Sequence, residues 1–498
     1  MEETGRCVLT LPLLTEPYQE HILEKRFAIM TKLRDNLVFK ELRKLRNLQR
    51  TRQYKDLMQQ IFETPKEKRK VLYRQRQKLL RDAGFSEFQF KDDIVPMQKH
   101  FVEHIAAQIA HRTASDVWRA FEKMLYSNGK RVHTRRGSPL MSVACQKIGN
   151  GMAYKDHVFH WNGGQDPHKI SLTIRVAYPS TFYEKQMLEK EIKYLRVVRK
   201  WVKDRYKYYL QFTLAGEPVP KGRTIGRGRV GIDIGTQSIA LVSSNAVRLL
   251  TLADRVQTNH EKALRIQRKM DRSRRAANPE NYNPDGTIRR GVRLHWQYSE
   301  HYRALAGELR HLQRKNADIR KYQHICLANE ILEMGDEIYV EDMDYRALQR
   351  RAKKTTRNAA GRYNRKKRFG KSLANRAPAM LLEILQRKAG AVSGVTVTRV
   401  GKWEFRASQY DHTDGTYRKK PLSQRSSRLS NGDLVQRDLY AAFLLMNADH
   451  TKLHIDPVRC QQTYPHFLEL HNQEIARHLH EDGHKQLSSF GIPQFCEP

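Results

Sequence analysis

Cysteine is scarce in this sequence of 498 residues, which has five cysteines, all far apart and without a CxxC pair. Disulfide frameworks and cysteine-ligated zinc sites both need cysteines at short spacings, so we expect neither. The scarcity fits a reducing compartment, and we predict a cytoplasmic protein. The five are Cys7, Cys145, Cys326, Cys460 and Cys496.

Long apolar runs are also missing. No uninterrupted stretch approaches the roughly 18 apolar residues of a membrane-spanning helix. The first residues, MEETGRCVLTLPLL, begin with acidic side chains and do not resemble a signal peptide. We therefore expect no membrane partner.

Acidic residues are in short supply relative to basic ones. Asp and Glu number 53 against 92 Lys and Arg, which gives a formal net charge of +39. The excess is spread along the chain instead of lying in one tail. Such a field attracts a polyanion, and we expect nucleic acid as the partner.

The length allows about three domains of ~150 residues, and three zones follow one another. Residues 1–15 look like a strand, and residues 16–136 show helical periodicity. In the helical zone, Leu42, Leu45 and Leu48 repeat on one face. A solvated bundle is the alternative to a nucleic-acid-binding bundle for such a segment. The interleaved basic residues that we expect to contact nucleic acid are Arg43, Arg46 and Arg50.

The second zone, residues 137–225, changes to short β segments such as MAYKDHVFHW and ISLTIRVA. Aromatic residues alternate with Lys and Arg near its end. This mixture suits stacking on bases beside phosphate contacts, and packing in a strand core is the alternative. The aromatic residues are Tyr194, Trp201, Tyr206, Tyr208 and Tyr209.

The third zone, residues 226–498, contains three carboxylates of interest. In VGIDIGTQSI, the alternation of Val230, Ile232 and Ile234 predicts a strand that points Asp233 to its other face. In DEIYVEDMDY, Glu341 ends a second predicted strand. Taken alone, each acid is more typical of a structural role than of a catalytic one.

The third carboxylate, Asp438, stands at the start of the predicted helix VQRDLYAAFLLMN, where a helix dipole also favours an acid. Strand aspartate, strand-end glutamate and helix-start aspartate, in this order, reproduce the ribonuclease H-like arrangement. There, distant carboxylates converge at one sheet edge. We predict Asp233, Glu341 and Asp438 as catalytic residues and metal ligands.

Phosphodiester hydrolysis needs an activated water and stabilisation of charge on two oxygens, which two Mg²⁺ ions ~4 Å apart can supply. Mn²⁺ is an alternative, because hard cations prefer carboxylate oxygen. We expect Asp233 to bridge both ions, with Glu341 and Asp438 on either side. Without metal, the three carboxylates should raise one another's pKa.

GIDIGTQSIA, IYVEDMD and QRDLYAAF resemble the three RuvC motifs of the TnpB proteins of insertion sequences and of their descendants, the type V CRISPR effectors. The likeness extends to connecting segments such as KALRIQRKMDRSRR and RFGKSLANRAPAMLLEILQRKA, and covers roughly residues 225–450. The N-terminal half matches the family only in layout.

The resemblance implies an α+β multidomain protein with an RNase H-like (RuvC) mixed-sheet nuclease domain at 226–498. A β-barrel-like wedge domain, residues 1–15 and 137–225, would be interrupted by a helical recognition domain at 16–136. Within the nuclease domain it implies a helical insertion at about 254–335 and a zinc-knuckle remnant at about 404–437. The basic segment at about 346–376 is expected to be either a flexible loop or a lid over nucleic acid, and its position just after Glu341 favours the lid.

The same resemblance implies an RNA-guided, Mg-dependent DNA endonuclease of the prokaryotic cytoplasm. A guide RNA would pair with one strand of a double-stranded DNA target, beside a short adjacent motif that the protein reads. Expected nucleic-acid contacts lie after the first motif and in the lid. Whether the protein is a monomer or a dimer stays open. These contacts are Arg268, Lys269, Arg272, Arg274, Arg275, Lys366, Lys367 and Arg368.

One departure from the family lies just before the third motif, where TnpB proteins usually carry a four-cysteine zinc knuckle. Residues 408–437 have no cysteine and a single histidine, His412. We therefore expect no zinc and a metal-free loop or hairpin, with turns at Asp414-Gly415 and Asn431-Gly432. The alternative is a site that joins His412 to the histidine-rich tail.

Two other functions stay open on the sequence. One is a DNA-only RNase H-like transposase or resolvase, which needs no guide. The other is a guide-dependent DNA-binding protein that does not cut, although the three intact carboxylates argue against it. RNA that copurifies with the protein would separate the guided functions from the DNA-only nuclease.

Overall fold

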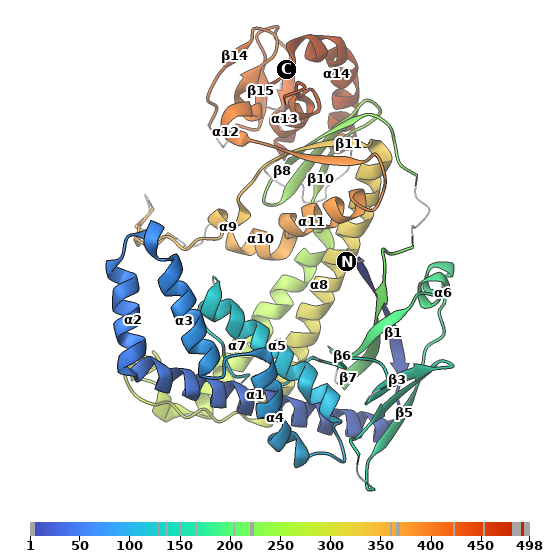
Figure 1. The fold of residues 1–498 in the computed structure, drawn as a ribbon. Helices are drawn as coiled ribbons and strands as arrows, with labels where there is room; N and C mark the ends of the chain where they lie inside the picture. Colours follow the sequence, from blue (N-terminus) through green and yellow to red (C-terminus); the bar gives the residue numbers. More distant parts are fainter. Residues whose placement is uncertain are drawn as a thin grey trace. The chain divides into compact units, whose positions relative to one another are not determined.

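The computed structural model divides the chain into two compact units, Met1–Lys221 and Gly222–Pro498 (Figure 1). Both helices and several sheets are present, so the predicted mixed α+β class is confirmed. Among the described residues, no helix is long and apolar enough to cross a membrane. The structure describes residues 5–127, 129–135, 138–149, 151–165, 167–203, 205–219, 224–358, 361–364, 369–421, 424–451, 454–480 and 490–492.

Helices fill the first half of unit 1. The longest of them begins with a proline in its first turn, where no backbone donor is needed, and with a capping box between Glu16 and Gln19. Pro65 precedes a short 3-10 turn, Lys66–Lys68, between two later helices. The helices are α1 (Pro17–Arg50), α2 (Arg52–Glu63), α3 (Lys70–Asp82), α4 (Glu87–Lys99) and α5 (Ala107–Tyr126).

The rest of unit 1 is a seven-stranded antiparallel sheet in the order β2-β6-β7-β1-β5-β4-β3. The N-terminal strand lies in the middle of this order and pairs with a strand about 200 residues later, with Leu11 opposite Leu210. No described pairing joins the edge strands β2 and β3, so the sheet is open and not a closed barrel. A short helix, α6 (Phe182–Leu188), precedes β6. The strands are β1 (Arg6–Leu14), β2 (Ser142–Ala144), β3 (Met152–Lys155), β4 (Val158–Asn162), β5 (Ser171–Val176), β6 (Ile192–Val202) and β7 (Arg205–Ala215).

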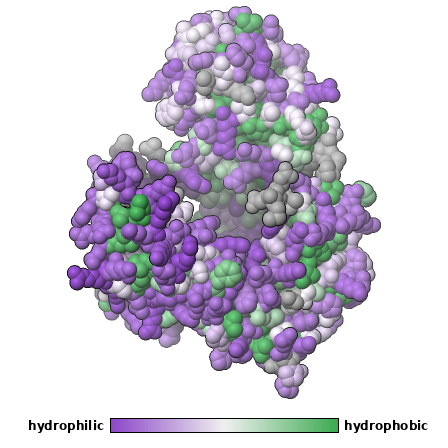
Figure 2. Space-filling view, viewed as in Figure 1, coloured by the Kyte–Doolittle hydropathy of each residue, from purple (hydrophilic) through white to green (hydrophobic). Residues whose placement is uncertain are grey.

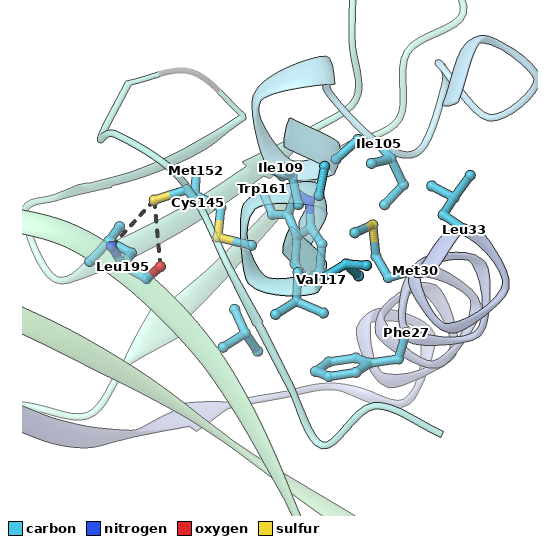
Figure 3. Close-up of a cluster of buried hydrophobic side chains, with 14 of the residues drawn as sticks. Phe27, Met30, Leu33, Ile105, Ile109, Val117, Cys145, Met152, Trp161 and Leu195 are labelled. Carbon is cyan, nitrogen blue, oxygen red and sulfur yellow. Dashed lines mark hydrogen bonds between the residues drawn. The ribbon is translucent and has the colours of Figure 1, made fainter. Parts of the chain in front are cut away.

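One hydrophobic core joins the helices of unit 1 to its sheet (Figure 3). Phe27 from α1 meets Trp161 from β4 in an edge-to-face contact, with ring centroids 6.4 Å apart. The sulfur of Cys145 accepts from the Leu195 amide at 3.3 Å. Arg26 is buried here and donates to the backbone oxygens of Trp161 and Ile170. The helical and β zones of the sequence therefore fold as one unit.

Unit 2 is built on a five-stranded mixed sheet in the order β10-β9-β8-β11-β12. The first three strands are antiparallel neighbours, whereas β8, β11 and β12 run parallel to one another. Parallel neighbours need a crossover, which the long helix α8 provides before β11 and α11 provides before β12. The strands are β8 (Arg229–Ile234), β9 (Ser238–Ser243), β10 (Val247–Thr251), β11 (Glu337–Glu341) and β12 (Thr396–Val400).

Helices cover both faces of this sheet (Figure 1). Residues of α8 and α11 pack on one face against Ile232 and Val340. Residues of α13 and α14 pack on the other face against Val242 and Leu249. Between β10 and α8, helix α7 packs against α8, and both helices lie within residues 254–335. The helices are α7 (His260–Ala276), α8 (Glu300–Met334), α9 (Tyr345–Leu348), α10 (Gly370–Arg376), α11 (Pro378–Ala389), α12 (Lys402–Phe405), α13 (Arg437–Met446) and α14 (Pro457–His480).

Candidate active site

Asp233 lies on β8 and points away from the α8/α11 face. Val230, Ile232 and Ile234 are buried on that face, as their alternation predicted. Asp233 and Gly231 therefore belong to the opposite face, against which α13 packs. The sequence expectation for the strand and its direction is confirmed.

Glu341 comes next to Asp233 through the register of the parallel pair. Val340 on β11 pairs with Ile232 on β8, so the following residues, Glu341 and Asp233, are neighbours on the same face. Adjacent strands lie about 4.8 Å apart. Tyr339 lies two residues before Glu341 and packs in the α13/α14 core. Because alternate residues of a strand share a face, Glu341 points to that face as well. Both carboxylates stand where their strands end.

Asp438 lies in the first turn of α13. Gln436 caps this helix, because its side chain accepts from the Leu439 amide at 2.7 Å. The helix can approach β8 only because residue 231 is glycine. A Cβ at Gly231 would lie 1.9 Å from the backbone oxygen of Ala442 and 2.6 Å from the amide nitrogen of Met446. This close approach brings the start of α13 to the sheet edge.

The charges of the three residues interact. Burial raises the pKa of Asp233 well above its usual range, and the charges of Asp438 and Glu341 raise it further, against the opposing effect of Arg437 and Arg425. Burial also raises the pKa of Glu341, against Lys402. Among the described residues, no hydrogen-bond donor reaches the Asp233 or Glu341 carboxylate. The structure therefore brings together all three predicted carboxylates.

In donor chemistry, the three carboxylates fit a hard divalent cation such as Mg²⁺. The three carboxylates are not close enough together to coordinate one ion, since no three His, Cys, Asp or Glu side chains in the described ranges are arranged to hold a metal. Asp438 is instead paired with Arg437, whose Nη2 lies 2.9 Å from its Oδ1. Metal binding would require this pair to open.

The similarity of this chain to known proteins is distant. No family model matches the chain, and no curated protein matches it. It is similar to a chain of the solved "Cryo-EM structure of the Cas12f1-sgRNA-target DNA complex" at 12% identity and a TM-score of 0.43, over 89% of this chain and 99% of that one. It is also similar to a chain of the "Cryo-EM structure of CRISPR-Cas12f Ternary Complex" at 12% identity and a TM-score of 0.28, over 86% and 82%. Similarity at this level carries no argument about activity.

Sequence reasoning missed two residues beside the carboxylates. Tyr345 follows β11, and its hydroxyl donates to the backbone oxygen of Ile234 at 3.1 Å. Burial raises the pKa of this tyrosine, as do the charges of Asp233 and Glu341. Lys402 follows β12 and is the cation that lowers the pKa of Glu341. Both stand directly after a strand of the parallel set, and that position is the only sequence signal for them.

The segment before α13 contains two short hairpins, and both predicted turns are present. Gly415 and Gly432 have φ values of 71° and 95°, which glycine adopts without strain. Asp411 is buried and accepts from the amide and hydroxyl of Thr413 and of Ser430. The hairpin strands are β13 (Tyr410–Asp411), β14 (Thr416–Tyr417), β15 (Ser426–Arg428) and β16 (Leu434–Gln436).

The histidines of this region are engaged within the core. His412 is buried, and its backbone amide donates to the Tyr440 hydroxyl at 3.0 Å. The Nε2 atom of His471 accepts from the Gln436 amide at 2.9 Å. His478 lies 3.0 Å from the backbone oxygen of Leu249. Of the remaining tail histidines, His484 lies outside the described residues.

The predicted nucleic-acid contacts in unit 2 divide into two groups. Arg274 and Arg275 pair with Asp271 at 2.6 and 3.0 Å and lie over the rings of Trp296 and Tyr282. They brace the chain after α7. Three others on α7 are exposed with no ion pair among the described residues: Arg268, Lys269 and Arg272. The predicted contacts Lys366, Lys367 and Arg368 lie outside the described residues.

In unit 1, α1 carries the predicted basic face. Leu45 is buried and Leu42 and Leu48 are half-buried, while the arginines between them point outward. These are Arg43, Arg46 and Arg50. The face of the molecule in Figure 2 is mostly hydrophilic, with apolar side chains in small separate patches.

The aromatic residues of β6 and β7 differ in burial. Tyr208 is buried, 2% exposed, and belongs to the core. Tyr206 and Tyr209 are half-buried and carry Arg199 and Lys200 at 4.4 and 4.8 Å from their ring centroids. The core interpretation therefore holds for Tyr208, and Tyr194 and Tyr206 are half-buried and pack against the same core.

Proposed function

We propose that this protein is an RNA-guided DNA endonuclease in which a single RuvC-type site hydrolyses the phosphodiesters of DNA. The observation that carries the proposal is the meeting of Asp233, Glu341 and Asp438 at one sheet edge. They come from a central strand, the end of its parallel neighbour and the start of a packed helix. The strand order, with antiparallel β9 and β10 on one side and parallel β11 and β12 on the other, supports an RNase H-like domain.

The chain's own residues have distinct parts in this proposal. Asp233, Glu341 and Asp438 would hold two Mg²⁺ ions, or Mn²⁺ in their place, which would activate water and neutralise charge on the reacting oxygens. Lys402, whose charge acts on Glu341, would attract a phosphate of the DNA. Tyr345 holds the end of β8 through the Ile234 oxygen and so keeps Asp233 in register.

The guided part of the proposal rests on the motifs that resemble those of TnpB proteins and type V effectors, and on the net charge of +39. The two solved proteins named above were determined with guide and target or as a ternary complex. We propose a guide RNA and a double-stranded DNA target with a short adjacent motif as partners. The wedge role of the unit 1 sheet and the recognition role of its helices belong to the same proposal.

The test is cleavage of a programmed target in Mg²⁺ by the complex purified with its RNA, after that RNA has been sequenced. We expect Asp233→Ala, Glu341→Ala and Asp438→Ala each to abolish cleavage, by 10³-fold or more, and to leave binding nearly unchanged. Asp342→Ala is the matched control, because Asp342 adjoins Glu341 but its side chain is 58% exposed and pairs with Arg399. Full cleavage by any of the three variants would remove that acid from the site.

One observation favours a second candidate, a guide-dependent DNA-binding protein that does not cut. The Asp438 carboxylate is occupied by Arg437, and the described carboxylates do not close around an ion. In that case the parent complex would bind its programmed target in Mg²⁺ or Mn²⁺ with no product. A DNA-only nuclease would instead cut after all RNA has been removed.

A further inference from the structure

Two guanidinium groups face the Asp438 carboxylate. Arg437 approaches its Oδ1 with Nη2 at 2.9 Å and Nε at 3.1 Å, and both side chains are 13% exposed. Arg425 approaches the other oxygen, Oδ2, with Nη1 at 3.9 Å. The charges of both arginines also reach Asp233. The protein itself therefore balances the charge of Asp438, and the same arginines only partly offset the causes that raise the pKa of Asp233.

The two arginines come from a paired segment and not from random surface positions. The amide of Arg437 donates to the backbone oxygen of Arg425 at 2.9 Å. The Nη1 atom of Arg437 donates to the backbone oxygen of Gln424 at 3.0 Å. The segment before α13 is thus tied to the first turn of this helix, which contains Asp438. This places the arginines beside the carboxylate by backbone geometry.

A divalent ion and these guanidinium groups compete for the same carboxylate oxygens and repel each other. Building on the proposed function, we propose that Arg437 and Arg425 form a latch on Asp438 that metal binding has to open. A phosphate of the nucleic-acid backbone is the partner that takes the two guanidinium groups when it opens. Arginine suits this exchange because its planar fork binds carboxylate and phosphate in the same bidentate manner.

The latch makes metal and nucleic acid bind cooperatively. DNA that draws the arginines away from Asp438 strengthens metal binding, and by thermodynamic reciprocity metal strengthens DNA binding at this site. Without DNA, the arginines keep the metal affinity low. The site is then assembled only on a bound strand. Arg437 and Arg425 are positioning residues in this account, since they act on the carboxylate before any reaction.

The test measures Mn²⁺ binding, not cleavage. Isotherms are recorded on the RNA-bound complex, with and without a single-stranded oligodeoxynucleotide whose phosphorothioate linkages resist hydrolysis. Mn²⁺ held by RNA or DNA is subtracted with the Asp233→Ala, Glu341→Ala, Asp438→Ala triple variant. We expect DNA to tighten the parent's site at least tenfold. Arg425→Ala with Arg437→Ala should tighten it at least tenfold without DNA and reduce the effect of DNA below threefold.

Arg428→Ala is the matched control, because Arg428 lies on β15 nearby but donates to the Gly432 oxygen instead. It should behave as the parent. The double variant also loses the hydrogen bond from Arg437 to Gln424, which could disturb the fold. The single variant Arg425→Ala keeps that bond and should still tighten Mn²⁺ binding at least threefold. Parental or weaker Mn²⁺ binding by a folded Arg425→Ala variant would overturn the latch. A triple variant that binds as much Mn²⁺ as the parent would instead overturn the proposed metal site.

Discussion

At the scale of single residues, Asp411 stabilises the two hairpins that precede α13. Its carboxylate is 3% exposed and accepts four hydrogen bonds, two from Thr413 and two from Ser430. These bonds tie the two hairpins before α13 together. A carboxylate so satisfied is stable in the interior without a metal.

We predict that Asp411→Ala loosens residues 408–437 without any change in metal content. Four partly buried hydrogen bonds to Asp411 are lost, which costs about 1–3 kcal/mol. Hydrogen exchange of this segment should accelerate at least fivefold. Asp414→Ala is the control, because Asp414 also bonds to Ser430 but through a more exposed side chain, and its effect should be smaller. One zinc per chain that is lost on His412→Ala would contradict the metal-free interpretation.

At the scale of elements, the contact between α1 and α4 contains two acidic residues whose pKa values are shifted in opposite directions. Glu41 is fully buried, and burial, with a smaller effect of Asp93, raises its pKa to about 7 against Lys44, whose Nζ lies 2.8 Å from Glu41 Oε2. Burial opposes the charge of Asp93, but hydrogen bonds with Glu41 and Lys40 and the charge of Lys44 lower its pKa to about 2. Glu41 therefore holds a proton more readily than Asp93 does.

This pair predicts a stability maximum for unit 1 in mild acid. The protonated Glu41 contributes stability that is present below its ordinary pKa of 4.5 and is lost as the pH rises toward about 7. The stability contributed by ionised Asp93 is lost only as the pH falls below the ordinary pKa of this group, 3.8. From pH 5 to 8, the free energy of unfolding of the parent should fall by about 3 kcal/mol relative to that of the Glu41→Gln variant. Hydrogen exchange of α1 measures the difference, and Glu24→Gln, at an exposed position of the same helix, should track the parent.

The contact between β8 and α13 depends on Gly231. A methyl group there would overlap the backbone of α13 at Ala442 and Met446. Gly231→Ala should therefore push α13 outward, destabilise unit 2 by about 1–3 kcal/mol, and displace Asp438 enough to lower cleavage at least 100-fold. Gly235→Ala is the control, since its nearest atoms lie at 3.4 and 3.5 Å. Parental cleavage by Gly231→Ala would show that Asp438 needs no fixed position.

At the scale of the whole molecule, the net charge of +39 predicts an affinity for nucleic acid that falls steeply as the salt concentration rises. Replacing Arg43, Arg46 and Arg50 by alanine should reduce the slope of log affinity against log salt by about 2–3, since each phosphate contact contributes about 0.7–0.9. RNA retention across a salt series measures this. Lys40→Ala is the control, because its ammonium already pairs with Asp93 at 2.8 Å. An unchanged slope would remove α1 from the RNA-binding surface.

Much of the candidate site could be predicted from the sequence because strand periodicity is local. The alternation around Asp233 fixed its face, and the apolar stripe of α13 fixed the start of the helix that carries Asp438. The open seven-stranded sheet of unit 1 could not be predicted in the same way. Its order depends on β1 pairing with β7 about 200 residues later, and a pairing over that separation leaves no periodic signal in either segment.

The sequence by itself determined the residue types, the basic character and the order of the three carboxylates. Only the tertiary structure decided that they meet, through the β8–β11 register and the close packing of α13 on Gly231. It also decided that Arg437 and Arg425 face Asp438, which no motif indicated. The physical reason is range. Side-chain periodicity acts over a few residues, whereas charge pairing and close packing act between any residues that the fold brings within a few ångströms.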